Sequence, residues 1–368
     1  MRRFSTLLFL CLLGFVSGFV GGFAEERQEP SLAQLCADYF PIGMGIGPAD
    51  LRDPAVWALV RHHCQQVTIE NALKPSPTQR QPGVFDFTQA EALIAAAEEA
   101  GLGVHAHTLV WHRQTPDWFF VDEAGEPFSS ELARSRLRQH IQGVAGHFRG
   151  RVQAWDVVNE ALVDGPGEDD FRPSPWYQAM GEEYIIKAFR LAAEADPEAL
   201  LYYNDYGLET EPKRSRAVRL IKRLQEAGVR VDGIGIQAHL QVDGPPIAEI
   251  ERSIVAFAEL GLRVHISELD VSVLPWRQPG SDLLPEDQIF SDGLSEEMAA
   301  KQRQRYRELF ALFLRHHEVI SGVTMWNTHD GRSWLNYFPV QDRVDHPLLF
   351  DRELQPKAAF AGVLQALE

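Results

Sequence analysis

The chain alternates short apolar runs with longer segments in which apolar residues return every three or four positions. The short runs predict buried β-strands, because an uninterrupted apolar run fills a strand that is covered on both faces. Eight such strands are expected, at 42–46, 66–69, 102–109, 152–158, 200–204, 231–237, 263–267 and 322–326.

The segments between these runs predict amphipathic helices. The clearest is 130–148, where apolar residues recur at helical spacing between a serine N-cap, Ser129 or Ser130, and a stop at Gly150. A proline at the first position favours another helix from Pro212.

Eight strand-then-helix repeats with non-alternating strands predict an α/β protein, a parallel (β/α)8 TIM barrel. The sequence shows no repeat, low-complexity block or Ser/Thr/Pro linker, so we expect a single domain over residues 32–368. In this fold the chemistry lies where strands end and the following loops begin.

The first residues are typical of an export signal. Arg2 and Arg3 precede an apolar run that ends in small residues near Ala24, which predicts a signal peptide over residues 1–24 and a secreted or periplasmic protein. No other long apolar run occurs, so we expect no membrane association after cleavage.

Composition and charge narrow the class of partner. The chain has 45% hydrophobic residues and a formal charge of −17; residues 1–24 hold two arginines and no acid, so their removal leaves −19. Such a charge repels nucleic acid and favours a neutral substrate. The remaining cysteines, Cys36 and Cys64, either form one disulfide or are two buried thiols, and their spacing does not match a zinc motif.

Polar residues cluster at seven of the predicted strand ends. Burying a lone polar group is costly, so a convergent set of carboxylates, amides and indoles indicates a site for a neutral, polyhydroxylated ring. Glu160 and Glu268 end the fourth and seventh strands, opposite each other in an eight-strand ring. Hydrolysis of a glycosidic bond requires two carboxyl groups of this kind, one protonated and one ionised.

Several motifs carry a resemblance to glycoside hydrolase family 10, the endo-β-1,4-xylanases. They are VTIENALKP (67–75), HTLVWHRQTPDW (107–118), WDVVNEA (155–161), YYNDYG (202–207), GIGIQAHL (233–240), HISELDV (265–271), the Trp-rich pattern at 326–334 and LLFDRELQPKAAF (348–360). The similarity spans nearly the whole chain after the signal.

The resemblance implies retaining hydrolysis of internal β-1,4-xylosidic bonds through a covalent glycosyl-enzyme. Glu160 would be the acid/base, Glu268 the nucleophile, and His239 with Asp270 would position Glu268. The residues implied to bind substrate are Glu70, Asn71, Lys74, His107, Trp111, Gln114, Asn159, Tyr206, Gln237, Trp326 and Trp334. Tyr206 either contacts substrate or braces the network. We expect a monomer that acts on xylan or xylo-oligosaccharides without a cofactor or metal.

Several positions depart from the family pattern, among them His105 and Gly207, and three others leave substrate preference open. Ala106 stands where the family usually has glycine, and Asn327, followed by His329, stands in another glycine's place. A barrel endoglucanase would use a similar glutamate pair. A metal-dependent amidohydrolase would use a pair such as His105 and His107, and a glycan-binding protein without activity would retain only binding.

Overall fold

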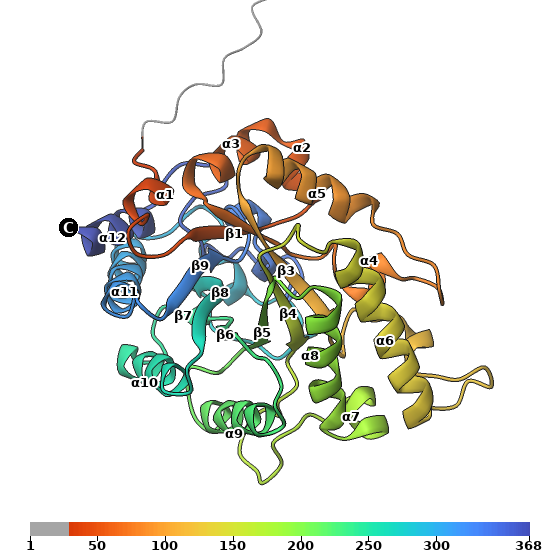
Figure 1. The fold of residues 1–368 in the computed structure, drawn as a ribbon. Helices are drawn as coiled ribbons and strands as arrows, with labels where there is room; N and C mark the ends of the chain where they lie inside the picture. The colour runs from red at the N-terminus through yellow and green to blue at the C-terminus, as the bar shows by residue number, and fades with distance from the viewer. Residues whose placement is uncertain (1–28) are drawn as a thin grey trace, which may run out of the picture.

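The computed structural model describes residues 29–368 and places a closed barrel of parallel strands at the centre, ringed by helices (Figure 1). Around the ring the strands follow chain order, and pairing of β6 with β8 and of β9 with β1 closes it. The strands are β1 (Ile42–Ile46), β2 (Gln66–Ile69), β3 (Gly103–Val110), β4 (Ala154–Asn159), β5 (Leu200–Asp205), β6 (Gly233–Ile236), β7 (His239–Gln241), β8 (Arg263–Ser272) and β9 (Ile320–Met325).

The predicted (β/α)8 fold is therefore confirmed, with strand bounds that differ from the sequence expectation by a few residues. Two differences bear on the site. Strand β8 continues to Ser272, five residues beyond the expected end, and the unexpected three-residue strand β7 pairs with this continuation. In that pairing His239 lies opposite Asp270.

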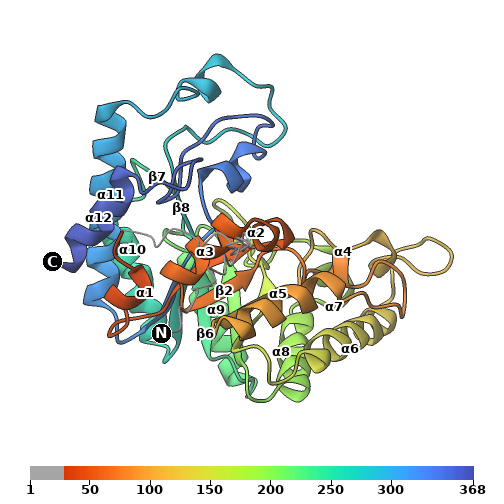
Figure 2. The same ribbon diagram turned by 90° about the horizontal axis from the view of Figure 1, so that it is seen from above.

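The helices form the outer layer, and the loops after β8 and β9 project to one side of the barrel (Figure 2). The α-helices are α1 (Leu32–Leu35), α2 (Pro48–Arg52), α3 (Pro54–His63), α4 (Pro75–Thr78), α5 (Thr88–Glu99), α6 (Ser130–His147), α7 (Pro175–Met180), α8 (Glu183–Ala195), α9 (Lys213–Glu226), α10 (Ile247–Ala258), α11 (Glu296–Arg315) and α12 (Ala358–Leu367). Short 3₁₀ turns are η1 (Asp117–Phe119), η2 (Pro285–Gln288), η3 (Asp330–Arg332) and η4 (Trp334–Asn336).

Local signals explain where these helices begin. Ser129, not Ser130, caps α6, because its Oγ accepts the Leu132 amide at 3.2 Å. The inner face of α6 buries Leu137 and Ile141 against the strands. Packing of such stripes against the barrel makes one continuous apolar core.

The barrel interior also holds polar side chains below the site. The ring of His265 contacts Thr324 Oγ1 at 3.0 Å and lies 4.6 Å, centre to centre, from the ring of His105. Burial of polar groups is tolerated where they bond to one another. This layer supports the strand ends from below.

Two sequence expectations concern parts of the chain away from the barrel strands. The predicted signal peptide, residues 1–24, lies outside the described residues. Cys36 and Cys64 are both buried and both unbonded, so the structure has two thiols in place of a disulfide. Within residues 29–368 no helix combines the length and apolar character needed to cross a bilayer.

Candidate active site

Glu160 follows β4 in a conformation that its neighbours hold from two sides. Its backbone φ is +56°, in the left-handed region that disfavours a residue with a side chain. The Glu160 amide donates to the Asn204 carbonyl at 2.9 Å, and the Glu160 carbonyl accepts from Arg172 Nε at 3.2 Å. These contacts direct the carboxyl group across the barrel mouth.

The Glu160 carboxyl group accepts three hydrogen bonds. Trp111 Nε1 donates to Oε2 at 3.0 Å, whereas Gln237 Nε2 and Asn159 Nδ2 donate to Oε1 at 3.3 Å and 3.5 Å. Burial raises the pKa of Glu160 above its ordinary value, and the negative charge of nearby Asp205 raises it further. This carboxyl group is therefore suited to donate a proton.

Glu268, within β8, has the opposite electrostatic environment. Its Oε1 accepts from Asn204 Nδ2 at 2.8 Å, and its Oε2 bonds to His239 Nε2 at 3.2 Å. Burial acts to raise the pKa of Glu268, but the hydrogen bonds from His239 and Asn204 and the positive charge of nearby imidazoles together outweigh it and leave the pKa below the ordinary value. Glu268 is the ionised member of the pair.

A second carboxylate, that of Asp270, favours the protonated form of His239. Its Nδ1 bonds to Asp270 Oδ2 at 2.9 Å, and Trp334 Nε1 donates to the same oxygen at 2.8 Å. Burial lowers the pKa of His239, but the charges and hydrogen bonds of Asp270 and Glu268 together outweigh it and raise the pKa to about 10. A cationic imidazole thus faces Glu268.

Three amide side chains connect the two glutamates. Asn159 Oδ1 accepts from Asn204 Nδ2 at 3.0 Å and from Gln237 Nε2 at 3.2 Å, while Ser267 donates to Asn204 Oδ1 at 2.6 Å. Because each amide also bonds a neighbour, its donor and acceptor orientation is defined. Amide groups so fixed can bind hydroxyl groups selectively.

A second polar group follows β2 and β3. Lys74 Nζ donates to Asn71 Oδ1 at 2.8 Å and to Gln114 Oε1 at 2.7 Å, and Gln114 Nε2 lies 3.3 Å from the same Asn71 oxygen. Lys74 Nζ also lies 5.0 Å from the centre of the Trp111 ring. The group formed by Asn71, Lys74 and Gln114 therefore lies beside Trp111, which donates to Glu160.

His107 and His105 both bond to one carboxylate on the adjacent strand. His107 Nδ1 and His105 Nε2 each lie 2.8 Å from an oxygen of Asp156. Asp156, on β4, thus ties its strand to β3. The His107 ring packs edge-on to Trp326, which is buried.

Tyr206 is braced from three directions. Its hydroxyl donates to Asp164 at 2.5 Å and accepts from Arg172 NH2 at 2.7 Å, and Lys213 Nζ lies 3.5 Å from the ring centre. The bracing role considered for Tyr206 is thus present, beside the Arg172 that also holds Glu160.

The structure adds positioning residues that sequence reasoning did not select. Asn204 contacts the nucleophile candidate, and its place at the end of β5 could have identified it. Glu209 accepts the Ala238 amide at 3.0 Å, where Ala238 has φ +60° immediately before His239. Arg172 lies in a loop far from any motif, so nothing in the sequence marked it.

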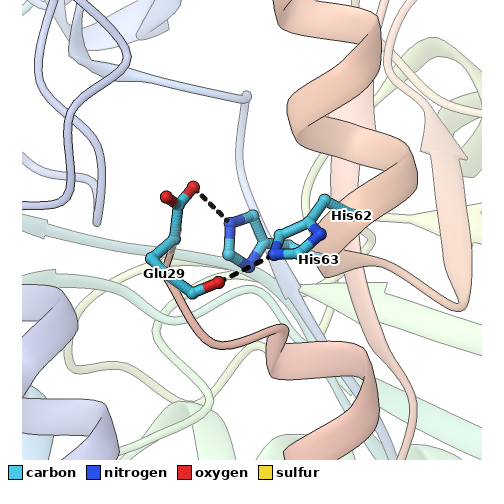
Figure 3. Close-up of side chains that lie close together, drawn as sticks. All are labelled: Glu29, His62 and His63. Atoms are coloured by element: carbon cyan, nitrogen blue, oxygen red, sulfur yellow. Dashed lines mark hydrogen bonds and ion pairs between the residues drawn. The ribbon is translucent and has the colours of Figure 1, made fainter. Parts of the chain in front are cut away.

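One group of possible metal ligands occurs among residues 29–368, and it lies away from this site (Figure 3). His62 Nε2 contacts the Glu29 carbonyl at 2.9 Å, and His63 Nε2 contacts the Glu29 carboxylate at 3.3 Å. The His63 Nδ1 accepts the Leu32 amide at 3.4 Å. Because β2 begins just after His63, this group lies at the amino-terminal end of the strands, opposite the candidate active site. There it connects Glu29 to the end of α3.

Comparison with known proteins gives consistent results. The profile of Glycosyl hydrolase family 10 matches residues 31–366. A beta-1,4-xylanase of Dictyoglomus thermophilum is 40% identical over 367 residues, covering 99% of each chain, and endo-1,4-beta-xylanase B of Paenibacillus barcinonensis is 39% identical, covering 92% of this chain and 99% of its own.

Solved structures agree with this. A GH10 endoxylanase from a sugarcane soil metagenome superposes with a TM-score of 0.88 at 38% identity, covering 92% of this chain and all of the other. A Paenibacillus barcinonensis xylanase in complex with a conduramine derivative gives 0.86 at 37% identity, again covering 92% of this chain and all of its own.

Proposed function

Because the chain belongs to glycosyl hydrolase family 10, we propose that Glu160 and Glu268 are the acid/base and the nucleophile of a retaining endo-β-1,4-xylanase. The hydrolase activity on internal β-1,4 bonds of xylan, with retention, follows from family membership and from the xylanase relatives. The assignment of roles rests on this chain's own geometry.

The observation that carries the assignment is the opposite displacement of two carboxyl pKa values within one network. The pKa of Glu160 is raised, by burial and by Asp205, and that of Glu268 is lowered by His239 against the effect of burial. One protonated and one ionised carboxyl group at a cleft is the arrangement that glycoside hydrolysis requires.

In the first step, a Glu268 oxygen attacks the anomeric carbon while the glycosidic C–O bond breaks. Glu160 transfers its proton to the leaving oxygen, so the departing sugar leaves as an alcohol. The product is a glycosyl ester on Glu268. His239, paired with Asp270, holds Glu268 in place.

In the second step, Glu160 is ionised and acts as a base. It removes a proton from a water molecule whose oxygen attacks the anomeric carbon, and the ester bond to Glu268 breaks. Two displacements at one carbon give net retention. Glu160 ends protonated and Glu268 ionised, which restores the starting state.

We assign substrate contacts to the residues around this pair. The group formed by Glu70, Asn71, Lys74 and Gln114 would bind sugar on the glycone side. The residues around the cleavage site would be His107, Trp111, Asn159, Gln237, Trp326 and Trp334, with Tyr206 on the leaving-group side. Support comes from their convergence at the carboxyl ends of the strands.

For the whole chain we propose a signal peptide over 1–24, a catalytic domain over 32–368, a monomer, and export to the periplasm or medium. The charged, apolar and small-residue order of the first 24 residues supports the signal. The net charge of −17 argues against nucleic acid as a partner.

Release of reducing ends from soluble xylan tests this function, with carboxymethylcellulose assayed in parallel. Faster release from xylan than from cellulose is the expected result. Release from cellulose alone would favour an endoglucanase, and binding of xylan without any release would favour a glycan-binding protein. Either outcome would contradict the proposal.

A further inference from the structure

Asn327 occupies a backbone conformation that glycine adopts more readily. It follows Trp326 at the end of β9 with φ +90°, and only 4% of its surface is exposed. A non-glycine residue is held in such a region only where its surroundings compensate for the strain. The contacts of the side chain indicate what provides that compensation.

The carboxamide of Asn327 joins two separate elements of the cleft. Its Nδ2 donates to Glu70 Oε2 at 3.0 Å, and its Oδ1 accepts the Trp334 amide at 2.9 Å. Glu70 follows β2, and Trp334 begins η4 after β9. Strand β1 lies between β2 and β9 in the barrel, so the side chain spans the top of β1.

Both partners of Asn327 belong to the proposed cleft. Glu70 adjoins Asn71 and the glycone-side group, whereas Trp334 donates to Asp270 and lies 4.8 Å, ring to ring, from His239. One buried amide therefore connects the glycone side with the residues that support the nucleophile.

We propose that Asn327 is a positioning residue for the glycone side of the cleft, which orients the Glu70 carboxylate to accept a hydroxyl of the sugar one place beyond the cleaved unit. This inference rests on the proposed function and on the role assigned there to Glu70. With Oε2 engaged by Asn327, the free lone pairs of the carboxylate are restricted in direction. A carboxyl oxygen accepts hydrogen bonds, so Glu70 can bind a hydroxyl donor of the sugar.

Replacement of Asn327 by glycine tests the proposal, because glycine tolerates φ +90° while the carboxamide is lost. Kinetics are measured on an aryl β-xylobioside and an aryl β-xyloside with the same leaving group. The xyloside fills only the position at the cleaved bond, whereas the xylobioside reaches Glu70. For Asn327→Gly, the ratio of kcat/KM for xylobioside over xyloside is expected to fall about tenfold, mainly through KM, as for loss of a hydrogen bond to a charged group. An unchanged ratio overturns the proposal.

A double-mutant cycle separates an effect through Glu70 from one through Trp334. In a Glu70→Gln background the Asn327→Gly change is expected to alter the ratio by less than about twofold, because the partner is already changed. A full tenfold loss in that background would contradict the proposal and assign the effect to Trp334.

Asn327→Asp supplies a second variant that retains the side-chain shape and the acceptor for Trp334. It replaces the donor to Glu70 by a like charge, so the xylobioside KM is expected to rise at neutral pH and to recover as the pH falls and one carboxyl group takes up a proton. A rise in KM that does not depend on pH contradicts the proposal.

Asp342→Gly is the matched control, since Asp342 is an exposed residue at φ +63°. It introduces glycine at a left-handed position without touching Glu70, and the substrate ratio is expected to stay as in the wild type. If the wild type hydrolyses neither xylan nor either aryl glycoside, the proposed function fails; if the wild type is active and the ratio is unchanged, only this inference fails.

Discussion

His239 and Asp270 face each other as register partners of β7 and β8, and their side chains are 2.9 Å apart. The pair accounts for the charge on the imidazole, which in turn keeps the neighbouring Glu268 ionised. The electrostatics of the proposed nucleophile thus depend on a strand pairing.

This pairing predicts a pH dependence of stability. Burial lowers the pKa of His239, but the interactions with Asp270 and Glu268 together raise it from 6.5 to about 10. The group therefore binds its proton more tightly in the folded state. Its contribution to stability is complete below pH 6.5 and is lost as the pH rises through about 10. The free energy of unfolding, measured with urea, is expected to be lower at pH 10 than at pH 6. His239→Asn should make the difference between these two values smaller.

Replacement of Glu268 by alanine should abolish turnover on every glycoside, by about 10⁴-fold or more, since no other group can form the covalent intermediate. Activity is compared on xylan and on an aryl xylobioside, with the melting temperature as a check of folding. Substantial residual hydrolysis of either substrate by a folded variant would refute the nucleophile assignment.

Replacement of Glu160 by alanine should affect the two substrates unequally. Xylan needs a proton on its poor leaving group, so its hydrolysis should fall about 10²- to 10⁴-fold. The first step on an activated aryl glycoside needs little protonation and should be spared by comparison. Equal losses in single-turnover rates would argue against the acid role.

Asp205 should control the alkaline limit of activity. Its negative charge raises the pKa of Glu160, in addition to the effect of burial, so Asp205→Asn should lower that pKa. Glu160 would then lose its proton at a lower pH, and the alkaline limb of the kcat/KM profile would move toward neutrality.

Asp164→Asn is the matched control for that experiment. Asp164 also bonds Lys213, at 2.9 Å, but unlike Asp205 it is not among the main influences on the pKa of Glu160. A displacement of the alkaline limb as large in Asp164→Asn as in Asp205→Asn would contradict the role of Asp205.

The barrel could be predicted from the sequence, and both glutamates could be selected as candidates, because these signals are local. Each buried strand is an apolar run with polar residues at its end, and the ends of parallel strands converge in this fold. Strand β7 was not predicted because three residues are too few to show a periodic pattern of apolar positions. The contact of Arg172 with Glu160 could not be predicted, because only the folded chain brings this loop residue close to Glu160.

Asn327 shows a different limit of sequence reasoning. Its departure from the family pattern was visible, but its effect depends on a backbone angle and two long-range partners, Glu70 and Trp334. Neither the backbone angle nor the two partners can be deduced from the spacing of residues along the chain.

The brevity of β7 has a consequence for heat inactivation. The three residues of β7 pair with the extension of β8 alone, whereas each strand of the closed ring has two neighbours, yet β7 holds the imidazole that faces Glu268. Local opening there costs far less free energy than melting of the closed ring. On warming, the enzyme should therefore lose activity while its circular dichroism is still that of an intact barrel. The highest temperature at which it works would then be set by this short strand, and stabilising β7 alone would raise it.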